Sequence, residues 1–201
     1  MRFIFLLSCL CVCVAFCACG RSMPTHYYIL ESSGTTMTSG GLPTTSLRVA
    51  PVSVPQYLDR TGIVRHGVQP ENLTVEETYQ WAEPLAEGIR RVVQEELAGL
   101  LRGKGVHVLA NADDSDSTYT LFIHVERLEA VQPGSVRLMA QWRCDRNAHT
   151  KAQGFFAEDC TVEGEGITAQ VQAQSVLVRH LAAWIESQLP NLANRGEGKR
   201  S

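Results

Sequence analysis

The feature that most constrains this chain is an amphipathic segment over residues 81–101, with the sequence WAEPLAEGIRRVVQEELAGLL. Its large apolar side chains recur every three or four residues, which places them on one face of an α-helix. They are Trp81, Leu85, Ile89, Val92, Val93, Leu97, Leu100 and Leu101. A helix with one apolar stripe needs a surface to cover, and we expect strands elsewhere in the chain to supply it.

The residues around this helix predict where it begins and ends. Thr74 and Glu77 have the spacing of a capping box, so we expect a short lead-in turn at residues 75–82. Pro84 has no amide hydrogen to donate and suits the first turn of a helix that begins near Glu83. Gly103 favours termination after the last apolar turn.

Most other patterned segments are strand-like. Alternating or β-branched apolar residues predict strands at 27–30, 47–54, 63–66, 106–109, 119–128, 135–143 and 155–164. A second amphipathic helix is expected over 168–189, ended by Pro190. Strand runs with few helices between them predict an α+β fold, a single domain in which a mainly antiparallel sheet carries both helices on one face.

The first residues indicate export and lipidation. One charge at Arg2, a short apolar run and small residues are typical of a signal peptide, which we assign to residues 1–18. Ala18-Cys19-Gly20 is typical of a bacterial lipobox, so Cys19 is the predicted lipidation site. The alternatives are Cys17, disfavoured by the preceding Phe16, and an ordinary cleaved signal that leaves a free cysteine.

Lipidation would decide where the protein resides. Two or more acyl chains, at about 0.8 kcal/mol per buried CH₂, hold a protein at a membrane essentially permanently. Gly20 follows Cys19 where an aspartate would signal retention at the inner membrane. We therefore expect the protein at the periplasmic face of the outer membrane.

The body of the chain is long enough for one domain with a proper core and too short for two. We place a short tether at residues 19–26, the domain at 27–190 and a disordered tail at 191–201, which has nothing to bury. The chain has 18 basic and 21 acidic residues with no basic cluster, which gives no support for nucleic-acid binding.

Cys144 and Cys160 are the cysteines that follow Cys19. They flank the expected loop of one hairpin, and in an oxidising periplasm we expect them to form a disulfide. Free thiols are one alternative. A metal site that includes His149 is another, but three ligands with irregular spacing are a poor zinc signature.

Catalytic motifs are not apparent in the sequence. The histidines are scattered, and we find no nucleophile elbow, HExxH motif, P-loop or dinucleotide fingerprint. We therefore expect neither catalytic residues, nor a cofactor, nor a metal.

Two motifs carry a resemblance to a known family. Residues 54–64 read VPQYLDRTGIV, and WAEPL follows at residues 81–85. This pair resembles the ABC-type transport auxiliary lipoprotein family, whose members carry a YLDR-like turn before a strand and a WAEPL-like helix start. The similarity follows the domain in order, from the lipobox through a strand ending in Ala140 and Trp142 to the final helix.

The resemblance implies an accessory role beside an inner-membrane ABC transporter and MCE-domain proteins that move lipids or other hydrophobic molecules. The lipoprotein would supply an outer-membrane docking point through protein contacts. Its motif residues are expected to be structural, with apolar residues in the core, charged residues in the turn and the rest at the helix start. They are Tyr57, Leu58, Asp59, Arg60, Trp81, Glu83, Pro84 and Leu85.

Two rival roles stay open. A lipoprotein that assists outer-membrane assembly would share the anchor and differ in its partner. A lipid-binding carrier would need an apolar cavity between the helices and the sheet, where the stripes instead carry large residues suited to a closed core. A ring-like homo-oligomer would suit a docking collar, but no residue pattern predicts one.

Overall fold

The computed structural model describes residues 23–34, 45–66, 72–109, 117–132, 134–189 and 192. The strands are β1 (His26–Tyr28), β2 (Thr45–Val49), β3 (Gly62–His66), β4 (Leu73–Trp81), β5 (Val106–Leu109), β6 (Tyr119–Gln132), β7 (Ser135–Arg146) and β8 (His149–Thr161). The helices are α2 (Leu85–Leu101), the short 3₁₀ helix η1 (Arg102–Lys104) and α3 (Gly166–Gln188). The predicted leader, Cys19 and the predicted tail apart from Leu192 lie outside these residues.

All eight strands belong to one mixed sheet. Its main path runs β1-β4-β3-β6-β2-β5, and β7 pairs with both β6 and β8. The long β6–β7 and β7–β8 pairings are antiparallel, as is β3–β4. The other pairings are parallel: β1 pairs with β4, β2 pairs with both β5 and β6, and β3 pairs with β6. The predicted α+β class is confirmed, with parallel pairings that the sequence did not indicate.

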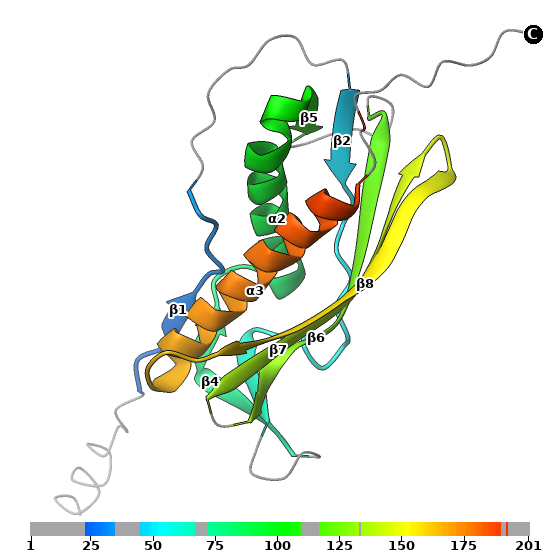
Figure 1. The fold of residues 1–201 in the computed structure, drawn as a ribbon. Coiled ribbons are helices and arrows are strands. Elements are labelled where there is room, and N and C mark those ends of the chain that lie inside the picture. The colour runs from blue at the N-terminus through cyan, green and yellow to red at the C-terminus, as the bar shows by residue number, and fades with distance from the viewer. Residues whose placement is uncertain are drawn as a thin grey trace, which may run out of the picture.

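Both helices cover the same face of the sheet and pack against each other (Figure 1). Most of the predicted α2 stripe is in the core, with Ile89, Val92, Val93 and Leu97 completely buried, but Leu100 is 41% exposed. From α3, the fully buried residues include Leu177, Val178, Leu181 and Ile185. These side chains meet inward-facing residues of β6 and β7 such as Leu121 and Leu138, so the space between helices and sheet is filled.

A bulge in β6 changes which residues face the helices. Before it, Leu121, Ile123 and Val125 are buried at alternate positions. The β6–β7 register then shifts between Val125 and Arg127, after which Leu128 is opposite the buried Leu138. Glu129 consequently points to the other face of the sheet, yet it is only 1% exposed. The Glu129 carboxylate therefore belongs to the candidate functional site.

The lead-in turn predicted before the first helix is wrong. Residues 73–81 form β4, which pairs with β3 and β1, and Thr74 and Glu77 belong to that strand. The helix begins at Leu85 after Pro84, and no side chain caps it. Pairing on both sides satisfies the backbone of this segment, so the local capping pattern did not determine its structure.

The predicted disulfide is also wrong, because both cysteines are free thiols. The hairpin turns tightly at Asn147 and Ala148, which have positive φ angles of 50° and 62°, and β8 begins at once with His149. Cys144 is therefore opposite Ala152, while Cys160 is opposite Val136 at the other end of the hairpin. Eight residues of strand correspond to about 26 Å, far beyond the reach of a disulfide.

Candidate functional site

The two motifs of the sequence meet at one surface groove. The YLDR turn precedes β3, and the WAEPL segment joins the end of β4 to the start of α2. Together they line a pocket of about 310 Å³. Its lining residues are Asp59, Arg60, Thr61, Trp81, Ala82, Glu83 and Pro84. Five of the eight predicted motif residues are thus brought together.

Two other apolar motif residues are buried in the core. Leu58 is 2% exposed and Leu85 3% exposed, and both belong to the same core as Trp81. The amide of Trp81 donates a 2.7 Å hydrogen bond to the Thr61 carbonyl, which joins the two motifs directly. These residues are therefore core anchors, while Asp59, Arg60 and Pro84 are exposed at the rim.

Gly62 allows the two strands beneath the groove to approach closely. A Cβ atom at this position would lie 2.6 Å from Val75 Cγ1 and 2.9 Å from the Glu76 carbonyl oxygen. The Glu76 oxygen is a backbone atom, so it cannot move aside as a side chain would. The irregular pairing of β3 with β4 at Gly62 therefore depends on the absence of a side chain.

An arginine fixes the helix start against the segment that follows β1. Arg91 of α2 donates from Nη2 to Glu83 Oε1 at 2.6 Å and to the Leu30 carbonyl at 2.8 Å. The hydrogen bond to Glu83 is the main reason that the pKa of Arg91 lies above its usual value. Glu83 is held facing the helix, so the free charges at the groove rim belong to Asp59 and Arg60.

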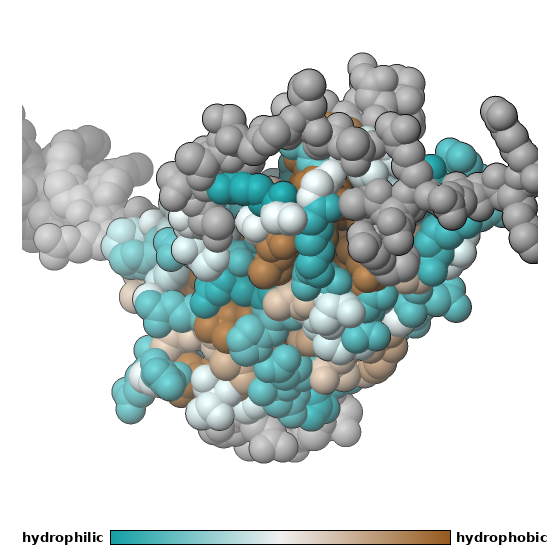
Figure 2. All heavy atoms as spheres, turned by 45° about the horizontal axis from the view of Figure 1, so that its top comes forward, coloured by the Kyte–Doolittle hydropathy of each residue, from teal (hydrophilic) through white to brown (hydrophobic). Residues whose placement is uncertain are grey.

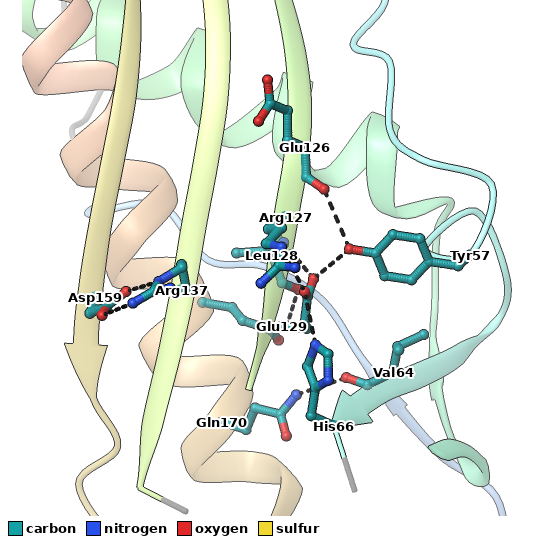
Figure 3. Close-up of polar contacts among 11 residues, drawn as sticks. Tyr57, Val64, His66, Glu126, Arg127, Leu128, Glu129, Arg137, Asp159 and Gln170 are labelled. Carbon is teal, nitrogen blue, oxygen red and sulfur yellow. Dashed lines mark hydrogen bonds and ion pairs between the residues drawn. The ribbon is translucent and has the colours of Figure 1, made fainter. Parts of the chain in front are cut away.

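Tyr57 ties the YLDR turn to the sheet (Figure 3). Its hydroxyl donates to Glu129 Oε2 at 3.0 Å. Glu129 also accepts a 3.0 Å hydrogen bond from the Leu128 amide and lies 3.3 Å from His66 Nε2. Burial, reinforced by the Glu129 carboxylate, raises the pKa of Tyr57 above its usual range. The phenol therefore stays protonated and remains a donor at physiological pH.

Glu129 and His66 were not predicted from the sequence. A glutamate between Leu128 and Ala130 fits an ordinary outward-facing strand position, and the bulge that sets its direction has no sequence signature. The cover over Glu129 comes from Tyr57 and His66, more than sixty residues earlier in the chain. Only the pairing of distant strands reveals this contact.

A larger hollow of about 740 Å³ lies on the sheet face opposite the helices and contains no residue of the YLDR or WAEPL motif. It is lined by Pro51, Ser53, Phe122, Ile123, His124, Gln141, Trp142, Arg143, Gln153, Gly154 and Phe155. The Arg143 guanidinium lies 4.4 Å from the centre of the Phe122 ring. Figure 2 shows one face of the molecule, on which the visible hydrophobic residues form small patches between hydrophilic ones.

The described residues show what chemistry the surface offers. Within them, no three His, Cys, Asp or Glu side chains are grouped so as to hold a metal ion. No helix in the described ranges is both long and apolar enough to cross a membrane. The motif groove instead combines opposite exposed charges with a buried aromatic base, a surface suited to protein contacts.

Comparisons with known proteins agree with this fold. The model of a family described as "ABC-type transport auxiliary lipoprotein component" matches residues 27–186. A solved structure of an uncharacterised protein is 21% identical with a TM-score of 0.70, and the match covers 82% of this chain and 98% of that one. A Xanthomonas campestris protein is 18% identical with a TM-score of 0.62, covering 80% and 92% respectively. No curated protein gives a significant match.

Proposed function

The chain belongs to the ABC-type transport auxiliary lipoprotein family, and we propose that it is the lipid-anchored docking component of such a transporter. In this proposal Cys19 is lipidated and holds the domain at the periplasmic face of the outer membrane. The domain binds the periplasmic end of an MCE-domain protein, which moves lipids or other hydrophobic molecules. The protein contributes contacts and no catalysis.

The observation that carries this proposal is the convergence of both family motifs on one groove. A purely structural role would account for the buried Leu58, Trp81 and Leu85. It does not account for Asp59 and Arg60, which are exposed at the rim. Adjacent opposite charges above an aromatic base favour a partner with complementary charges, which fix its orientation on the groove.

The position of the groove also suits a protein held by its N-terminus. β1 ends beside the groove, since Tyr28 is the register partner of Trp81 and its carbonyl accepts a 2.8 Å hydrogen bond from Ala82. The seven residues from Cys19 to Thr25 span at most about 25 Å when fully extended. Lipidation at Cys19 would thus keep the groove close to the membrane that anchors the protein.

Charge reversal at the rim tests this proposal. Full-length Arg60→Glu and wild-type protein would be used to capture partners from cell envelopes. We expect wild type to recover an MCE-domain protein and the variant to recover several-fold less of it, because rim charges set orientation and association. Equal recovery would exclude the groove as the docking site.

A matched control is available at the other end of α2. Lys104 is 55% exposed and forms an ion pair with Glu186, so Lys104→Glu makes the same charge change with a small expected cost in stability. It should recover the partner as wild type does. Recovery of an outer-membrane barrel without any MCE-domain protein would instead favour the assembly role.

A further inference from the structure

β8 forms a free edge of the sheet. It is 13 residues long and pairs only with β7 among the described strands. From Ala152 to Thr161 its register with β7 is unbroken. A long regular edge presents unpaired backbone groups that can pair with a strand from another chain. Proline, which would block such pairing, does not occur in β8.

The register shows which residues offer these groups. Val162 donates a 2.8 Å hydrogen bond to the Gly134 carbonyl, which makes these two a hydrogen-bonded pair at the end of the hairpin. Because hydrogen-bonded positions alternate along an antiparallel pair, the even-numbered residues from Ala152 to Cys160 bond to β7. The amides and carbonyls of Gln153, Phe155 and Ala157 therefore point towards the free edge.

The side chains of β8 are arranged symmetrically about its centre. Phe155 is the middle residue of the strand and is 47% exposed on the face opposite the helices. Lys151 precedes it by four residues and Asp159 follows it by four. Arg137 on β7 holds Asp159 in place through two 2.6 Å hydrogen bonds (Figure 3). Lys151 is at the point where β8 has one more residue than β7.

We propose that β8 pairs antiparallel with β8 of a second copy of this chain, with the two-fold axis at Phe155. In this register each Phe155 contacts its counterpart, and Gln153 is opposite Ala157 of the partner subunit. Lys151 is opposite Asp159 of the partner subunit, and symmetry repeats that contact. A single register thus pairs the free backbone groups, covers the exposed ring and brings Lys151 to the Asp159–Arg137 ion pair of the partner subunit, because the strand is complementary to itself.

The pairing would also bring two surface hollows together. The large hollow on the outer face of the sheet is bounded by Gln153, Gly154 and Phe155 at the β8 edge. A second copy placed across that edge continues the sheet and brings its own hollow beside the first. The pair would present one extended concave surface in place of two separate ones.

Cysteine cross-linking in cells that express the full chain tests the register. In a Cys160→Ser background, Gln153→Cys and Ala157→Cys are combined in one chain and treated with a short bis-maleimide. The proposed register places each new thiol opposite its partner, so we expect cross-linked dimers. Each single variant serves as a control. With one new cysteine per chain, the two thiols of a dimer lie four residues apart along the paired strands, about 14 Å.

Lys151 provides a second readout in the double-cysteine chain. Lys151→Glu places a glutamate opposite Asp159 of the partner subunit, and the two-fold symmetry repeats this repulsive contact. We expect the dimer yield to fall about fivefold or more. Lys151→Arg preserves the charge and should leave the yield unchanged. Dimers from the single variants, or none from the combined one, would overturn the proposal. Adducts of any other mass would assign this edge to a different protein and overturn it as well.

Discussion

The contact between Tyr57 and Glu129 is the most specific link between a family motif and the sheet, and Tyr57→Phe removes it without changing the ring. The Tyr57 hydroxyl donates to Glu129 Oε2 at 3.0 Å, and Glu129 is 1% exposed. A hydrogen bond to a charged group contributes about 1.5–3 kcal/mol. Because water cannot readily replace the lost donor, we expect the free energy of unfolding to fall by about 2 kcal/mol.

Urea unfolding followed by circular dichroism measures this change. The midpoint should fall while the m-value stays constant, since the same surface is exposed on unfolding. For a domain of this size, about 2 kcal/mol corresponds to a decrease in Tm of roughly 4–8 °C. Tyr27→Phe is a matched control, because Tyr27 is 65% exposed. That variant should remain within about 0.5 kcal/mol of wild type.

A double-mutant cycle with Glu129→Gln assigns the effect to this contact. The two changes should be non-additive by about 1–2 kcal/mol, because each removes the same interaction. A Tyr57→Phe variant as stable as the Tyr27→Phe control would refute the reasoning. So would strict additivity with Glu129→Gln, which would locate the loss elsewhere.

Three further outcomes follow from the structure. Gly62→Ala should lower the free energy of unfolding by about 2 kcal/mol or more in the same urea assay, because its Cβ would lie 2.9 Å from the backbone oxygen of Glu76; an unchanged midpoint would show that the strands separate freely. In the folded protein a maleimide should label the half-buried Cys160 and leave the fully buried Cys144 unlabelled until urea unfolds the chain; rapid native labelling of Cys144 would contradict its burial. Burial raises the pKa of Cys144 from its usual value of 9.0 to about 12, so the native state keeps a proton that the unfolded chain loses. The free energy of unfolding therefore keeps its full contribution from the Cys144 thiol below pH 9 and falls as the pH rises towards 12, by up to about 1.4 kcal/mol per pH unit. In Cys144→Ala the free energy of unfolding should decline less steeply over this pH range; a slope equal to that of wild type would contradict the raised pKa.

The parts of the fold that were predicted correctly depend on local periodicity. Most residues of the predicted α2 stripe are buried, although Leu100 is 41% exposed, and Pro84 marks the helix start because its missing amide hydrogen restricts it to that end. The Trp81 side chain was expected in the core and is 7% exposed. Each of these features can be inferred from residues within a few positions of one another.

The parts that were missed depend on contacts between distant residues. Parallel pairing of β2 with β6 joins residues 47–49 to residues 119–121, and no short pattern specifies such a partner. The disulfide prediction failed because the hairpin turns at Ala148, with φ at 62°, a conformation that alanine rarely adopts. Glu129 is buried by Tyr57 and His66 through a bulge that is not visible in the sequence.

Lipidation of Cys19 stays a prediction of the sequence, as does the outer-membrane location that depends on it. Both concern residues outside the described part of the chain. The groove formed by the two motifs is the part of the proposed function that the described residues support. Its central claim is that an MCE-domain protein docks there.

Site-specific photo-cross-linking in living cells tests that claim most directly. A photoreactive residue would replace Arg60 at the groove rim in one strain and Lys104 at the far end of α2 in another. We predict a covalent adduct with an MCE-domain protein from position 60 and none from position 104. No adduct from position 60, or equal adducts from both positions, would contradict docking at the groove.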